Sequence, residues 1–485
     1  MIFENTGYTV VGCLLAILVY IVVRFTQKVD EAKRIYGNDS ELCKAGDYMW
    51  KLDGEYNYTI INGVIFAEEA TLEDVQEMFL KAVNAEHYRK FKQRLIMFQR
   101  IPMWITDEDF DHKWHISKET HAVPTNDDEL DLWLARQAVE ALPIDRPMWQ
   151  VKIVENYKTN ADGKGETVVL FRCHHVIADG IALGTMLFNL LNNEKEAKKL
   201  LGGASLTSEM KLKADESSSK VNKQKVANPW LVNAYGLLML LPIMGGLLLQ
   251  RTDTNMFHVK PNRGVEGKRT VGRSGSYPLE KVKLIKTKLK MTVNDVLMGV
   301  LGAAINRTTT RLNKGPCPTE VKVVMPVNMR TGTGVPKMEN DLTMPVIPIP
   351  TRSADPVATC KEMKVILDGI KKSVTPLVMY HAQTTMAAIL PSFLTSFILD
   401  FVANKHTAVV SNGPGSQMYI GTKKVSNMVF WVPQRANMAM GFSIMTMGGK
   451  LTLGCILDTS LGPHADVLCE EYMKTLKDLE SSVLN

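Results

Sequence analysis

The sequence has few cysteines, and their spacing is typical neither of a disulfide framework nor of a metal site. Its seven cysteines are far apart, odd in number and include no CxxC pair. That pattern argues against a secreted disulfide scaffold and a thiolate zinc site, and it fits a reducing compartment. The helical zinc signature HExxH is also absent. We therefore expect no metal site.

A strong net charge is missing as well. The formal charge is +6 over 485 residues, and the basic residues are scattered rather than striped beside aromatic ones. This predicts that the protein does not bind nucleic acid. A weakly basic surface suits an anionic membrane face or a phosphate-bearing cosubstrate. The hydrophobic share of 45% and the charged share of 22% are ordinary for a globular protein, and the length suggests two or three domains.

The first apolar stretch lies near the N-terminus. Residues 5–23 carry no charge, which is close to the roughly 20 residues that a helix needs to cross a bilayer. Glu4 is the one charge before it, and basic residues follow it at Arg24, Lys28, Lys33 and Arg34. A secretory signal would have its positive charge ahead of the apolar core. We expect residues 1–27 to be an uncleaved transmembrane anchor with the body in the cytosol, the alternative being a buried core helix.

A second apolar block spans residues 230–249. It follows a lysine-, glutamate- and serine-rich stretch, residues 193–228, which we interpret as a solvated linker. The block is uncharged, but Pro242 and Gly245-Gly246 interrupt it. Helix breakers near its end favour a membrane-associating segment over a crossing helix, and a buried core segment is an equal alternative.

The chain is organised around residues 167–191. Residues 167–173 form a β-branched and apolar run that predicts a buried strand, and residues 181–191 predict a packed helix. Between them lie His174, His175 and the turn Asp179-Gly180. Successive strand side chains point to opposite faces, so we expect one histidine to face a cavity and its neighbour to pack away from it. A neutral imidazole there is a candidate general base.

The remaining pattern alternates helices and strands, which predicts an α/β fold with mixed sheets. Expected helices cover residues 72–83, 279–290, 292–306 and 387–402, the last kinked or started by Pro391. Expected strands cover residues 150–155, 321–327, 408–410, 411–416, 427–432 and 450–456. Thr292 or Asn294 is the expected N-cap of its helix. The basic stretch 87–100 is interpreted as a solvated helix face.

Five short motifs occur in a fixed order. They are LPIDRPMW at 142–149, HHVIADG at 174–180, TVNDV at 292–296, PVNMR at 326–330 and SNGPGS at 411–416. Together they resemble the wax ester synthase/diacylglycerol acyltransferase family of the CoA-dependent acyltransferase superfamily, over roughly residues 40–480. Two features depart from the family. TMGG stands at 446–449, where the family usually has SYxG, so any contact from that tyrosine is absent. The N-terminal apolar stretch and the 230–249 block are more typical of eukaryotic members than of bacterial ones.

The resemblance implies a two-lobed fold with a channel between the lobes. On that basis we expect an N-terminal lobe at residues 40–200, a crossover linker at 201–270 and a C-terminal lobe at 271–485. It implies acyl-CoA as cosubstrate, a lipid alcohol as acceptor and no bound cofactor. We further expect an endoplasmic reticulum membrane location, with lipid droplets as an additional site.

The resemblance also implies roles for individual residues. The catalytic motif comprises His174, His175 and Asp179, with His175 taking the proton from the alcohol as it attacks the thioester. Asp179 is expected to be structural, paired with Arg330, beside Gly180. Asn294 and Asp295 would border the channel or cap their helix, and Ser411 or Asn412 would donate to the oxyanion or form a tight turn.

Three functions stay open. The first is an acyltransferase that esterifies a long-chain alcohol or diacylglycerol. The second is a condensation-type or other acyltransferase, although the chain lacks carrier-domain sequence. The third is a catalytically silent lipid-binding protein, against which the complete HHxxxDG motif counts. The acceptor, the chain-length preference and the oligomeric state are not readable from the sequence.

Overall fold

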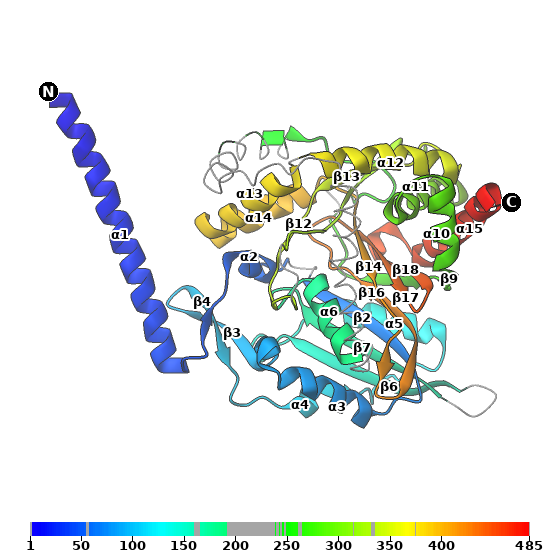
Figure 1. Ribbon diagram of the computed structural model, residues 1–485, viewed down its shortest axis with the longest axis horizontal. Helices are drawn as coiled ribbons and strands as arrows, with labels where there is room; N and C mark the ends of the chain where they lie inside the picture. Colours follow the sequence, from blue (N-terminus) through cyan, green and yellow to red (C-terminus); the bar gives the residue numbers. More distant parts are fainter. Residues whose placement is uncertain are drawn as a thin grey trace.

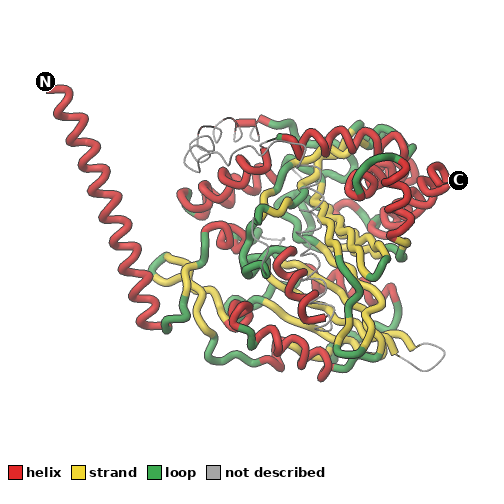
Figure 2. The backbone as a smooth tube through the Cα atoms, in the orientation of Figure 1, coloured by secondary structure: helices red, strands yellow, loops and turns green. Residues whose placement is uncertain are grey.

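The computed structural model describes residues 2–54, 58–159, 165–191, 249–259, 264–313, 315–330, 335–373 and 375–484, together with residues 238, 242, 245 and 246. On the first helix it describes the side chains of residues 16, 19, 20 and those from 22 onward. The predicted solvated linker 193–228 lies outside these residues, as does most of the predicted membrane-associating segment 230–249. The structure has two lobes, each built on a mixed β-sheet (Figures 1 and 2).

The first lobe contains a six-stranded sheet with helices on both faces. The strand order is β15 (Tyr419–Ile420), β16 (Lys423–Trp431), β2 (Ile60–Glu68), β7 (Gly165–His174), β6 (Trp149–Thr159) and β5 (Ile116–Lys118). Helices α3 (Leu72–Val83) and α6 (Gly180–Leu191) pack on one face. Helix α5 (Asp127–Val139) packs on the other. Shorter helices of this lobe are α2 (Ala45–Tyr48), η1 (Met49–Lys51), η2 (Glu86–Lys92) and α4 (His112–His115).

The second lobe contains a seven-stranded sheet. Its order is β13 (Val346–Pro350), β10 (Glu320–Val324), β14 (Ala408–Pro414), β17 (Met440–Met447), β18 (Lys450–Asp458) and β8 (Arg269–Arg273), with β9 (Tyr277–Pro278) also on β18. Its large core includes residues of α10 (Leu279–Lys288), α11 (Val293–Leu312), α12 (Pro356–Lys372) and α15 (Ala465–Leu484). Helices α13 (Thr375–Ile389) and α14 (Ser392–Ala403) lie outside that core. Strands β11 (Val327–Asn328) and β12 (Leu342–Thr343) pair with each other, and η3 (Thr459–Leu461) follows β18.

A segment from the second half of the sequence belongs to the first lobe. Strands β15 and β16 come from the second half of the sequence, yet β16 pairs antiparallel with β2 in the first sheet, from Val425↔Ala67 to Trp431↔Asn62. The chain then returns to the second sheet through β17. The predicted boundary near residue 270 therefore does not separate the lobes cleanly, because residues 419–431 belong to the first sheet.

Local sequence explains where the central elements begin. Strand β7 lies between β2 and β6, and its residues from Thr167 to His174 are buried, as expected for an apolar run in mid-sheet. Helix α11 begins after Thr292, whose side chain accepts from the Asp295 N–H, while the Asp295 side chain accepts from the Thr292 N–H. Asp295 therefore acts as a helix cap. The predicted helix at 387–402 is two helices, α13 and α14, separated at Leu390-Pro391.

Helix α1 (Ile2–Tyr36) stands away from both lobes (Figure 1). Its C-terminal part meets the body: Val29 and Ala32 pack on Ile101 and Met103 of the small sheet β1 (Glu41–Leu42), β4 (Ile101–Thr106) and β3 (Gln93–Phe98). Among the residues that the structure describes, no helix is long and apolar enough to span a bilayer. The transmembrane part of the predicted fold is thus unsupported, and most of the side chains that the prediction rests on are outside the described ones.

Candidate active site

The two adjacent histidines lie where strand β7 ends. The His174 N–H donates to Met148 O at 2.9 Å, and the His175 N–H donates to Thr59 O at 2.7 Å. Both side chains are buried, with 3% of His174 and 7% of His175 exposed. The backbone is thus fixed on both sides, and the two rings find different partners, as expected for neighbours on a strand.

His174 has a structural role. Its Nδ1 accepts from the Val176 N–H at 3.1 Å, so the proton lies on Nε2, which donates to Asp53 Oδ2 at 3.1 Å. Burial alone would raise the pKa of Asp53, but hydrogen bonds from His174 and Thr59 bring that pKa below its usual value. Both ring nitrogens of His174 are therefore engaged in hydrogen bonds, so neither has a lone pair available to accept a proton from a substrate.

His175 is held in the opposite tautomer by Asn340. The Asn340 Nδ2 donates to His175 O at 2.8 Å and to Asp47 Oδ1 at 3.0 Å, which fixes the orientation of the amide. Its Oδ1 must then accept, and it lies 2.6 Å from His175 Nδ1. Nδ1 consequently carries the proton, and Nε2, which has no hydrogen-bond partner among the described residues, keeps its lone pair.

The surroundings of His175 keep it neutral. Its ring stacks on Trp50, with centroids 3.9 Å apart and planes at 15°. Burial lowers the pKa of His175 to about 4, although the charge of Asp179 and the hydrogen bond to Asn340 oppose the shift. At physiological pH the ring is therefore an uncharged base.

A buried ion pair supports Asn340. Lys90 Nζ lies 3.0 Å from Asp47 Oδ2 and also donates to Ile177 O at 3.3 Å. Asp47 Oδ1 accepts from the Asn340 backbone N–H at 2.6 Å. The 87–100 stretch is therefore not a solvated helix face: Lys90 lies on η2 with 8% of its side chain exposed, and residues 93–98 form β3.

Asp179 forms the ion pair that we predicted. Its Oδ2 accepts from Arg330 Nη1 at 2.7 Å and from the Asp341 N–H at 3.0 Å. Its Oδ1 accepts from the N–H groups of Ile181 and Ala182, the first turn of α6. Gly180 follows it, and an added Cβ there would meet no atom within 4 Å, so the protein leaves this side of α6 open.

The other predicted site residues form a separate pair of contacts. Asn412 Nδ2 on β14 donates to Asn294 Oδ1 on α11 at 2.6 Å. Ser411 pairs with Ser443 in the β14–β17 ladder. Within the described part of the chain, no hydrogen bond joins these residues to His175. Their part in the channel or at the oxyanion stays a prediction.

An apolar cavity lies between the lobes, close to His175. About 1110 Å³ of space here is not filled by protein atoms, a volume that includes the open solvent at its mouth. Its wall is formed by Trp50 and Thr59 of the first lobe and by residues of β10, β13, β14, α13 and α14. Trp50 therefore links the two: it lines the cavity, and its ring also stacks on the His175 ring.

Sequence reasoning missed Asn340, Asp47 and Trp50. Asn340 is 165 positions from His175, and Asp47 is 293 positions from Asn340, so no local spacing links them. The one available signal was the polar pair Asn340-Asp341 just before the apolar run at 342–350. In the described residues no group of histidine, cysteine, aspartate and glutamate side chains is placed to bind a metal, and the described cysteines are free.

Two family models match the chain. The wax ester synthase/diacylglycerol acyltransferase catalytic domain matches residues 64–297. The WS/DGAT C-terminal domain matches residues 338–480. The two matches include His174, His175, Asp179 and Asn340, which are the residues that the structure brings together.

Curated relatives share low identity over most of their length. Wax ester synthase/diacylglycerol acyltransferase 10 of Arabidopsis thaliana is 22% identical over 390 residues, covering 73% of this chain and 78% of the relative. A probable diacylglycerol O-acyltransferase of Mycobacterium tuberculosis is 23% identical over 439 residues, covering 83% and 92%.

Solved structures share the fold. The wax ester synthase/diacylglycerol acyltransferase of Marinobacter aquaeolei VT8 has a TM-score of 0.63 at 17% identity, over 92% of this chain and all of that one. The first condensation domain of the CDA synthetase has a TM-score of 0.54 at 14% identity, over 92% and 97%. At such identities the likeness shows the two-lobed architecture alone.

Proposed function

The chain belongs to the wax ester synthase/diacylglycerol acyltransferase family, and from that premise we propose that it esterifies a long-chain alcohol or diacylglycerol with a fatty acyl group from acyl-CoA. One observation carries the proposal for the chemistry. His175 Nδ1 lies 2.6 Å from Asn340 Oδ1, so the opposite nitrogen, Nε2, is an unprotonated base in a buried site.

The proposed reaction needs one proton to move twice. His175 Nε2 takes the hydroxyl proton as the alcohol oxygen attacks the thioester carbonyl carbon, which forms the new C–O bond. When the tetrahedral intermediate breaks its C–S bond, protonated His175 returns the proton to the CoA sulfur. No covalent acyl-enzyme and no metal are needed, because the thiolate is a good leaving group.

The neighbours of His175 suit both of its protonation states. Burial keeps the resting ring neutral, with its pKa lowered to about 4. In the protonated state, the ring would be stabilised by the negative charge of Asp179 and by the Asn340 Oδ1 acceptor. We propose that the apolar cavity beside Trp50 holds an alkyl chain, since its wall is mostly aliphatic.

We also propose that the enzyme works at the endoplasmic reticulum membrane, with its body in the cytosol, and that it also reaches lipid droplets. Support comes from α1, which stands clear of the body and exposes Val19, Tyr20 and Val22 by 60%, 64% and 54%. The basic residues Arg24, Lys28, Lys33 and Arg34 follow this apolar part, as expected on a cytosolic flank.

The test is His175→Ala in the full chain, assayed with labelled acyl-CoA and either hexadecanol or diacylglycerol. We expect ester formation to fall by about 10²–10⁴-fold, the usual contribution of a general base. His121→Ala, which removes an exposed histidine, is the matched control. Near-normal turnover by the His175 variant would refute the assignment.

The same assay with hexadecylamine as acceptor distinguishes the condensation-type alternative. Amide formation in preference to ester formation by the unmodified protein would favour that alternative. Acyl-CoA binding without any transfer would favour a silent lipid-binding protein.

A further inference from the structure

Helices α13 and α14 form an apolar hairpin on the outside of the second lobe. Phe393, Phe397 and Phe401 follow one another at four-residue intervals along α14 and are 76%, 64% and 38% exposed. Residues four apart share a helix face, so these rings form one stripe. Ile389, at the end of α13, is 72% exposed beside it. Large apolar side chains are thus grouped here, whereas single exposed ones are normal on any surface.

The hairpin also lacks charge on its outer side. From Thr375 to Ala403 the only charged residue is Asp400. Its Oδ1 lies 2.8 Å from Arg435 Nε, and Arg435 also lines the interlobe cavity, so this charge is paired on the side of the body. The hairpin's outer face therefore offers aromatic and aliphatic groups, and the cation Lys405 lies just beyond α14, with its Nζ 4.6 Å from the centroid of the Phe401 ring.

The inner side of the same hairpin is apolar too. Met379 and Met386 of α13 and Leu399 and Val402 of α14 line the same cavity as Trp50, whose ring stacks on His175. A helix that is apolar all round is normally buried in a core or in a membrane. Here one side faces a cavity that suits an alkyl chain, and the other side faces outward.

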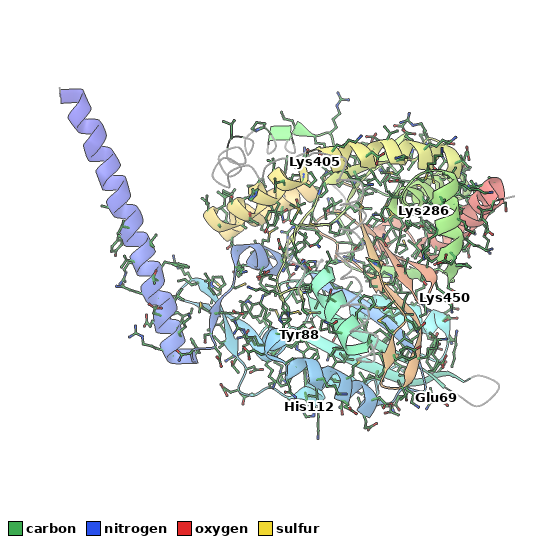
Figure 3. All side chains as sticks on the ribbon, in the orientation of Figure 1. Glu69, Tyr88, His112, Lys286, Lys405 and Lys450 are labelled. Carbon is green, nitrogen blue, oxygen red and sulfur yellow. The ribbon has the colours of Figure 1, made fainter. Side chains whose placement is uncertain are left out.

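The position of the hairpin agrees with a second apolar feature. Gln250 O accepts from Lys405 Nζ at 2.7 Å, and Gln250 Oε1 lies 3.2 Å from His406 Nε2, just beyond the end of α14. Leu249, the last residue of the predicted membrane-associating block, is 85% exposed. Figure 1 shows α13 and α14 projecting toward the side where α1 stands, and Figure 3 labels Lys405 beside them.

We propose that the outer face of α13 and α14 docks on a lipid surface, with Phe393, Phe397 and Phe401 inserted among the acyl chains. Docking there places the cavity mouth at the membrane. A membrane-dissolved alcohol then passes between the lobes to His175 without crossing water. This second step rests on the proposed function, whereas the docking itself does not.

A lipid surface fits this face better than a second copy of the chain. Stable protein interfaces combine an apolar centre with a polar rim and about one hydrogen bond per 100–200 Å². The outer stripe of α14 has rings at its centre and no charged rim within the hairpin. Contact with lipid acyl chains requires neither a polar rim nor hydrogen bonds.

The docking is tested by a photoreactive residue in the full chain. We place p-benzoylphenylalanine at Phe397 and irradiate the protein with phosphatidylcholine/phosphatidylserine vesicles. The same residue at Leu284 of α10, 57% exposed, is the control on another surface. Phospholipid adducts at Phe397 in clear excess over Leu284 support the proposal. Equal labelling, or a crosslinked dimer in place of lipid adducts, overturns it.

The delivery step is tested by kinetics. Phe393→Ser, Phe397→Ser and Phe401→Ser are combined, and Leu132→Ser, Leu284→Ser and Val365→Ser serve as a matched triple at exposed apolar sites elsewhere. With diacylglycerol in vesicles we expect the hairpin triple to raise KM by about tenfold to a hundredfold, since it removes three membrane-inserting rings. With dissolved hexanol both triples should match the unmodified protein.

An equal rise in KM for both triples, or none for either, would overturn the delivery step. If the unmodified protein transfers acyl groups to no alcohol at all, the proposed function fails instead. The photochemical result then still decides the docking, because it needs no turnover.

Discussion

Which nitrogen of His175 can act as a base depends on which one carries the proton, and the side-chain amide of Asn340 determines this. The Asn340 side chain has both of its ends engaged, with Nδ2 on His175 O and on Asp47 Oδ1. The amide therefore cannot flip without losing two hydrogen bonds, and its Oδ1 stays the acceptor for Nδ1. Asn340 touches no reacting atom, so it is a positioning residue.

We expect Asn340→Ala to lower kcat about 10- to 100-fold, the range that corresponds to losing a buried hydrogen bond of about 1–3 kcal/mol. The ring can then rotate or change tautomer, so the fraction with Nε2 free falls. KM for acyl-CoA should stay unchanged, because Asn340 holds the base and not the substrate. Steady-state kinetics with varied acyl-CoA measures both.

Asn255→Ala is the control for that change. It removes another half-buried asparagine, whose side chain donates to Thr407 Oγ1 and accepts from the Phe257 N–H instead of contacting His175. We expect its kcat to stay near that of the unmodified enzyme. If both variants lost kcat equally, the Asn340 effect would reflect general loosening of the fold rather than the tautomer of His175.

At this scale the sequence predicted what is local in the chain. The two histidines at a strand end were expected to diverge, and they do: His174 bonds Asp53 and His175 bonds Asn340. The pairing of Asp179 with Arg330 followed from the family motifs and is confirmed. Asn340 was not predictable from spacing, because its contact with His175 depends on how the two lobes meet.

Among the elements, α6 is the one that links the motif to the rest of the fold. Asp179 caps its first turn with Oδ1 and holds Arg330 with Oδ2. The aspartate is fully buried, and the Arg330 side chain is 11% exposed. One carboxylate thus fixes a helix start in the first lobe and the 326–330 motif of the second half.

We expect Asp179→Asn to destabilise the protein by about 3–5 kcal/mol, since breaking a buried ion pair leaves Arg330 without its counter-charge. Activity per folded molecule should fall only modestly, because the charge that favours protonated His175 is lost, but no hydrogen bond joins Asp179 to His175 among the described residues. Urea unfolding gives the first quantity, and turnover corrected for folded fraction gives the second.

The double variant Asp179→Asn with Arg330→Met is the matched control. It removes both charges, so it should recover part of the lost stability. An Asp179→Asn protein that is as stable as the parent but inactive would show that the carboxylate acts in the chemistry.

Elements with strong local signals were predicted well. The helix expected at 72–83 is α3 (Leu72–Val83), with a capping box between Thr71 and Asp74. Strand β17 was missed because all of its residues are buried, which erases the alternation that marks a half-exposed strand. The TMGG sequence ends this strand: Thr446 and Met447 are its last residues, and Gly448 and Gly449, with φ of 56° and 76°, form the turn to β18.

At the scale of the molecule, the lobes are not independent bodies. Strand β16 completes the first sheet from the second half of the chain. The contacts of Asn340 with Asp47 and His175 cross between the same halves. The alternation of strands and helices predicted mixed sheets, and the family resemblance implied two lobes; the structure confirms both. They could not predict the exchange of strands, because pairing between distant strands leaves no local pattern.

This interlocked core also buries histidines, and that makes stability depend on pH. Burial lowers the pKa of His115, His175 and His406 to about 4 in the folded protein. In the unfolded chain the usual value is about 6.5. Between these values the unfolded state binds protons that the folded state does not, so stability falls as pH drops from 6.5 toward 4.

His115 allows this to be measured away from the catalytic base. It is 1% exposed, donates Nδ1–H to Trp149 O at 2.8 Å and stacks on the same indole at 4.5 Å. From pH 7 to pH 5 its protonation in the unfolded state should cost the parent about 2 kcal/mol. His115→Gln cannot take up that proton, so its stability deficit at pH 7 should shrink by that amount at pH 5. Urea unfolding at both pH values tests this, with exposed His121→Gln as control. A deficit that stays constant would mean that folded His115 takes up this proton as readily as the unfolded chain does, and that burial beside Trp149 does not lower its pKa.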